Sequence, residues 1–118
     1  MLIDEFRDYC LSKKWTDEKT PFGPDVLVLR VGEKMFALCG FDSQPFRANL
    51  KCDPEWAIEL REQYAQVTPG YHMSKVHWNT VVLEELDQKL CKQLIDHSYD
   101  LIVNSLPKKL LRALEQNG

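Results

Sequence analysis

Apolar positions recur at three- and four-residue intervals in three parts of the chain, and this spacing is typical of amphipathic helices. It predicts a first helix beginning at Leu2, a second at Asp53 and a third at Asp87. Asp53 suits a helix start because its carboxylate can accept a hydrogen bond from a free backbone N–H, and Pro54 fits the first helical position. Pro107 should end the third helix and open a fourth, whose leucines repeat at helical spacing.

The middle of the chain shows the patterns of strands instead. Apolar runs at 26–31 and 35–41 lie on either side of Gly32, whose tolerance of positive φ predicts a tight hairpin turn. Shorter strands are expected from Trp15, before a loop rich in proline and glycine, and across residues 77–83.

The segment FRANLKCD, residues 46–53, alternates between apolar and polar side chains. Because successive side chains of a strand point to opposite faces, this alternation predicts a half-buried strand. Its inner face would carry Ala48, Leu50 and Cys52, and its outer face Arg47, Asn49 and Lys51.

Together these elements predict an α+β fold in the order α-β-β-β-β-α-β-α-α, an antiparallel sheet covered by helices. The 118 residues, with 44% hydrophobic and 28% charged side chains, indicate one domain over 1–118, and we expect a monomer. No apolar run approaches the roughly 20 residues that span a bilayer. Asp4 and Glu5 stand where a signal peptide would be basic and then apolar, so we expect a cytoplasmic protein with no membrane partner.

Catalytic and cofactor motifs are not evident in the sequence, so we expect neither an enzyme nor a cofactor. The four cysteines lie in separate apolar segments without C-x-x-C spacing, which favours four reduced core residues: Cys10, Cys39, Cys52 and Cys91.

The segment PGYHMSKVHWNTVVL, residues 69–83, gathers polar aromatic residues. His72 and His77 are five residues apart. A metal site needs three or four ligands, and these two histidines alone are too few, so no metal is expected. If a strand begins here, His77 and Trp78 face opposite sides, with Trp78 buried in the core and His77 exposed.

A third set of residues could contact nucleic acid. Basic and amide side chains on or beside hairpins can reach phosphates and base edges. The net charge of −3 argues against a dedicated DNA-binding protein, since phosphate neutralisation supplies much of the affinity of such proteins. The candidates are Arg30, Lys34, Arg47, Asn49, Lys51 and Lys75.

Two stretches resemble one known family. PGYHMSKVHWNTVVL is similar to the signature of the MmcQ/YjbR family, and HSYDLIVNSLPKK is similar to its downstream helix and Leu-Pro break. The resemblance covers nearly the whole chain and implies a CyaY-like (frataxin-like) fold. Members are small bacterial proteins often described as DNA-binding because their hairpins look like a "double wing". The matching signature residues are His72, Lys75, His77, Trp78, Ser98 and Tyr99.

The leading expectation is therefore a non-enzymatic protein that binds double-stranded DNA through basic hairpin wings. The alternative is a module that binds a protein or a small ligand with the sheet face near Tyr71, His72 and His77.

Overall fold

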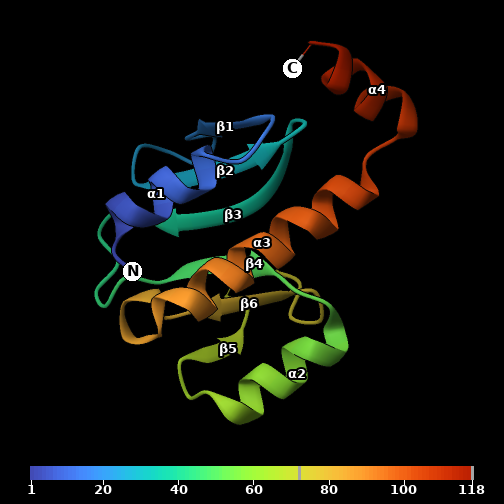
Figure 1. Ribbon diagram of the computed structural model, residues 1–118. Helices are drawn as coiled ribbons and strands as arrows, with labels where there is room; N and C mark the ends of the chain where they lie inside the picture. The colour runs from blue at the N-terminus through green and yellow to red at the C-terminus, as the bar shows by residue number, and fades with distance from the viewer. Residues whose placement is uncertain (72, 118) are drawn as a thin grey trace.

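Six antiparallel strands form one sheet in the order β1-β2-β3-β4-β6-β5 (Figure 1). The computed structural model describes residues 1–71 and 73–117. The strands are β1 (Thr16–Lys19), β2 (Val26–Val31), β3 (Lys34–Gly40), β4 (Ala48–Lys51), β5 (Val67–Pro69) and β6 (Trp78–Val81). The helices are α1 (Ile3–Leu11), α2 (Pro54–Gln63), α3 (Gln88–Ser105) and α4 (Lys108–Asn117), with a 3₁₀ turn, η1 (Leu83–Glu85).

The predicted α+β class and the predicted elements are confirmed, and two short elements are added. These are β5, which pairs with β6 at the edge of the sheet, and η1. β5 has only three residues, of which Thr68 and Pro69 are exposed, so it carries no alternating pattern to detect.

Local signals define the element boundaries. Asp53 caps α2 by accepting a hydrogen bond from the Trp56 backbone N–H at 3.2 Å, as predicted. Gly32 and Glu33 have φ values of 55° and 70°, so the β2–β3 hairpin turns through two left-handed residues. Pro107 separates α3 from α4, which lies beyond the end of α3 in Figure 1 and places Leu114 close to Gly32 of the β2–β3 hairpin turn.

The helices leave the two faces of the sheet in different surroundings. α1 and α3 pack against one face, where α3 crosses β2, β3 and β4. The side chains of this closed face form the core with Phe6, Ile95 and Ile102. The four cysteines are free and buried, as predicted.

Among the helices that the structure describes, none packs against the central strands on the opposite face of the sheet in Figure 1, and we call this the open face. Within the described residues, no helix is both long enough and apolar enough to cross a membrane.

Candidate functional site

Strand register determines which side chains reach the open face. Asn49 on β4 pairs with Leu38 on β3 and with Thr80 on β6, so these three side chains form one row across the sheet. Neighbouring positions alternate: Ala48 and Leu50 point into the core. The predicted division of this strand into an inner and an outer face is confirmed.

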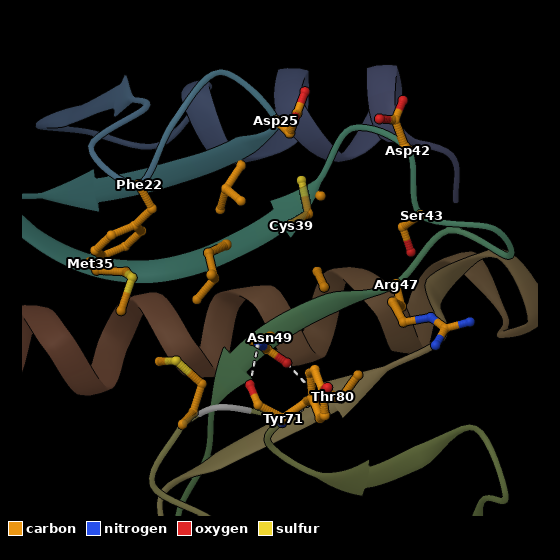
Figure 2. A pocket seen from close by; sticks show the side chains of 15 residues that line it. Phe22, Asp25, Met35, Cys39, Asp42, Ser43, Arg47, Asn49, Tyr71 and Thr80 are labelled. Atoms are coloured by element: carbon orange, nitrogen blue, oxygen red, sulfur yellow. Dashed lines mark hydrogen bonds between the residues drawn. The ribbon is translucent and has the colours of Figure 1, made fainter.

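A groove with a cavity volume of about 660 Å³ lies on the open face (Figure 2). Its floor is formed by β2, β3, β4 and β6, and its walls by the β1–β2 loop and the β5–β6 loop. Most of the lining is apolar: Phe22, Val26, Met35, Leu38, Gly40, Ala48 and Met73. In Figure 2, α3 lies behind the sheet, so the groove and the helical layer are on opposite sides.

Two exposed aromatic residues lie at opposite walls of the groove. The side chain of Phe22 is 66% exposed beside Met35, and that of Tyr71 is 71% exposed on the other wall. Together with the apolar lining between them, these rings extend the apolar surface of the groove, and contiguous apolar surface of this kind marks ligand or partner sites.

The backbone of Tyr71 is fixed by a polar pair on the floor. The Thr80 hydroxyl accepts a hydrogen bond from the Tyr71 backbone N–H at 3.0 Å and donates one to the side-chain oxygen Oδ1 of Asn49 at 2.5 Å. The Asn49 amide in turn donates to the Tyr71 carbonyl oxygen at 3.4 Å. Asn49 and Thr80 therefore hold this wall of the groove in place.

Charged residues gather at one end of the groove. Asp25 precedes β2, Asp42 follows β3 and Arg47 precedes β4, which brings them to the same end of three adjacent strands. The Arg47 guanidinium donates to the carbonyl oxygens of Gln44 and Pro45, each at 3.4 Å. These bonds are long, and among the described residues no carboxylate lies within 4 Å of this guanidinium.

The six residues predicted to contact DNA fall into three groups. Four of them share the open face: Arg30, Arg47, Asn49 and Lys51. Arg47 and Lys51 are each two residues from Asn49, and Arg30 is two residues from Val28, which pairs with Leu38 on that face. Lys34 lies at the exposed hairpin turn. Lys75 is exposed in the β5–β6 loop, and its carbonyl oxygen accepts a hydrogen bond from Arg61 at 2.5 Å.

Two members of this set already have partners within the protein. Arg30 forms a two-pronged ion pair with Asp17, with distances of 2.8 and 2.7 Å, and this contact lowers the pKa of Asp17. Asn49 uses both ends of its amide to hold Thr80 and Tyr71. Both arrangements reduce what these side chains can offer to a nucleic acid.

The three histidines lie in different settings. His72 is outside the described residues. His77 is exposed just before β6, as predicted. His97 packs edge to face on Trp56, and its Nε2 accepts a hydrogen bond from the Asp53 backbone N–H at 3.0 Å. Among the described residues, no group of three histidine, cysteine or carboxylate side chains could hold a metal ion.

Sequence comparison gives the family. The YjbR family model matches residues 11–101. The chain belongs to the YjbR family. It is 32% identical over 117 residues to the Escherichia coli K12 protein YjbR, covering 98% of this chain and 99% of that one. The E. coli O157:H7 protein YbdF is 40% identical over 91 residues, covering 75% and 74% of the two chains.

Solved structures agree with this membership. The crystal structure of the Deinococcus radiodurans protein DR2400 superposes with a TM-score of 0.88 at 34% identity, covering 95% of this chain and 86% of that one. A Pseudomonas syringae protein gives a TM-score of 0.73 at 32% identity, covering 86% and 98%.

Three of the YjbR signature residues have structural contacts in this protein. The Ser98 hydroxyl donates to the Phe36 carbonyl oxygen at 2.6 Å and accepts from the Lys51 N–H at 2.9 Å. The Tyr99 hydroxyl donates to the Lys14 carbonyl oxygen at 2.6 Å. Trp78 is buried, as predicted, but it lies two residues before Thr80 on β6, so its side chain is on the open face and outside the core cluster in which it was expected.

Sequence reasoning missed a contact that fixes the β5–β6 loop. Arg61 on α2 donates to the side-chain oxygen of buried Asn79 at 2.8 Å and to the Lys75 carbonyl oxygen. A basic residue at the end of a predicted helix gives no sign that it reaches a strand 18 residues away, so no pattern could have revealed this link.

Cys39 borders the groove, but its pairing with Ala48 directs its side chain into the core. The residue is 4% exposed, and burial raises the pKa of its thiol to about 12. The thiol is therefore protonated near neutral pH, and a protonated thiol is a poor nucleophile.

Proposed function

We propose that this YjbR-family protein is a non-catalytic binding protein that takes a small, mostly apolar ligand into the groove on its open face. The observation that carries this proposal is the groove itself, about 660 Å³ with an apolar lining. Small-molecule sites are typically concave and mainly apolar, with volumes of roughly 300–1,000 Å³ and a few polar groups that orient the ligand.

Two further features support binding rather than catalysis. The wall carrying Tyr71 is held in place by Asn49 and Thr80. Because this wall is already ordered, little conformational entropy is lost there when a ligand binds. The buried, protonated Cys39 thiol offers no activated nucleophile.

A change at Gly40 tests this function. Gly40 lies on the groove floor, and the nearest atom to a Cβ placed there is the Asp25 carbonyl oxygen at 3.9 Å, so a Cβ fits without a clash and a larger side chain at this position would occupy the groove. The probe is N-phenyl-1-naphthylamine, an uncharged dye that becomes fluorescent in apolar surroundings. We expect the wild-type protein to bind it saturably, and Gly40→Leu to weaken binding by at least about tenfold while the fold is kept.

Phe41→Ala is the matched control. Phe41 is 44% exposed and adjacent to Gly40 in sequence, but it does not line the groove, so dye binding should be unchanged. The proposal is wrong if the wild type does not bind the dye, or if Gly40→Leu, folded by circular dichroism, binds it equally well.

Duplex DNA is a second candidate ligand, favoured by one observation. Arg47 and Lys51 lie on the same open face, and Lys34 extends from the adjacent hairpin turn. Arginine and lysine in such positions would contact phosphates. Asp25 and Asp42 on the same side would oppose the approach of a polyanion, which is why we rank this candidate second.

A salt series tests DNA binding. Labelled duplex is titrated with protein at salt concentrations from about 50 to 200 mM, over which phosphate-driven affinity falls steeply. Lys51 does not line the groove, so Lys51→Gln should weaken DNA binding and reduce the salt slope by about one, while leaving dye binding intact. Absence of saturable binding at the lowest salt rules out this candidate.

A further inference from the structure

We propose that this protein forms a two-fold symmetric homodimer in which α4 of each chain binds a groove at the start of α3 of the other chain. This inference goes beyond ligand binding on the open face and does not depend on it. It replaces the expectation of a monomer, and it follows from two surfaces of opposite charge at the two ends of α3.

The first surface is a groove of about 650 Å³ beside η1 and the start of α1, which we call the η1 groove. The Met1 ammonium donates to the Leu83 carbonyl oxygen at 3.0 Å, which fixes the start of α1 beside η1. Leu2 and Phe41 line the groove and are 53% and 44% exposed. Large apolar side chains exposed together in a groove are typical of an interaction site.

The charged lining of the η1 groove is acidic. It consists of Asp4, Glu84 and Glu85, all exposed, and the described lining residues include no lysine or arginine. The Glu84 side chain is oriented by a hydrogen bond that it accepts from the Phe46 backbone N–H at 3.3 Å. A groove that is apolar with an acidic rim complements a segment that is apolar and basic.

The second surface, α4, has this chemistry. Three leucines share one side of the helix and are only half-buried within one chain: Leu110, Leu111 and Leu114. Three basic residues and one acidic residue, all exposed, give residues 108–117 a net charge of +2: Lys108, Lys109, Arg112 and Glu115. The leucines would supply affinity through burial, and the charges would fix the orientation of the helix in the groove.

The positions of the two surfaces favour a closed dimer. η1 directly precedes α3 and α4 directly follows it, so the two surfaces lie at opposite ends of α3 (Figure 1). The 18 residues of α3 separate these ends by roughly 27 Å, which keeps α4 away from the groove of its own chain. A two-fold axis across the middle of α3 exchanges the ends, so both contacts form at once.

The outer side of α3 is complementary about the same axis. Lys89 and Asp100 are exposed, and because they are 11 residues apart, close to three helical turns, they lie on one side of the helix. When two copies of α3 cross antiparallel about an axis midway between these residues, Lys89 of each chain faces Asp100 of the other.

Analytical ultracentrifugation of the full chain tests the dimer. We expect a reversible equilibrium between the 13.8 kDa monomer and a dimer of twice that mass, weakened by added salt. If the wild type remains monomeric up to about 1 mM protein, the inference is overturned.

Charge reversal locates the interface. The variant Lys108→Glu with Lys109→Glu and the variant Asp4→Lys with Glu85→Lys should each dimerise at least about tenfold more weakly, because like charges meet in both contacts. An equal mixture of the two should restore dimers, because both contacts of the mixed dimer pair opposite charges. A folding defect would not be corrected by mixing.

Glu55→Lys with Glu59→Lys, at exposed positions on α2, is the control. It changes the net charge as much as Asp4→Lys with Glu85→Lys does, and it should leave the dimer intact. The inference is overturned if the reversed-charge variants dimerise like the wild type, if their mixture stays monomeric, or if the control weakens the dimer equally.

Discussion

Ser98 shows how one small side chain can connect two strands to a helix. The β2–β3 ladder shifts register between Leu29 and Arg30, which leaves Phe36 on β3 without an opposite residue. Ser98 on α3 is fully buried, and its hydroxyl satisfies both the Phe36 carbonyl oxygen and the Lys51 N–H on β4. A hydroxyl is required here because it can donate and accept at once.

Ser98→Ala should therefore be costly for its size. It leaves two backbone groups unpaired at a buried site, and each such group costs about 1–3 kcal/mol. The free energy of unfolding from urea denaturation measures the loss. Ser105→Ala is the control, because the Ser105 hydroxyl donates to the Ile102 carbonyl oxygen within its own helix. Equal losses in the two variants would contradict the bridging role of Ser98.

At the scale of elements, His97 links α3 to the start of α2. Its Nε2 accepts a hydrogen bond from the Asp53 backbone N–H, so the ring must be unprotonated at that nitrogen. Burial lowers the pKa of His97 below its usual value, and the nearby carboxylates of Asp53 and Asp100 oppose this change only in part. The folded protein thus favours neutral His97.

This contact makes stability depend on pH. The contribution is complete above the unfolded-state pKa of about 6.5 and is lost as pH falls towards the lower folded-state pKa. Urea denaturation between pH 8 and pH 5 should show this decline in the wild type. His97→Gln keeps a hydrogen-bond acceptor that does not titrate, so the decline should become smaller. His77→Gln, at an exposed position, should keep the wild-type decline, and a similar change in both variants would refute this explanation.

At the scale of the whole molecule, much of the fold could be predicted because its signals are local. The alternation at residues 46–53 gave the correct faces of β4, and Gly32 marked the hairpin turn. Asp53 and Pro107 marked helix boundaries. In each case a few adjacent residues contain the physical cause, namely a side-chain period, a left-handed backbone or a cap.

The groove could not be predicted in this way, because it depends on strand register and on two distant loops. Phe22 and Tyr71 lie on opposite walls of the same groove although 49 positions separate them in the sequence. The alternation of side chains along a strand predicted that Trp78 and His77 face opposite sides of the sheet, but not which side each faces. The pairing of Trp78 with Lys51 shows that the Trp78 side chain faces away from the helices. Of the predicted site, the open-face location of Arg47, Asn49 and Lys51 was correct, whereas the Arg30–Asp17 pair was not foreseen.

The division of one sheet into a closed and an open face has a consequence for protein engineering. On β3 and β4, adjacent residues serve different purposes, since one side chain contributes to the core and the next lines the groove. Positions 38, 40 and 47 can therefore be randomised together while the residues between them are kept. A combinatorial library built in this way would sample new binding specificities on an unchanged framework.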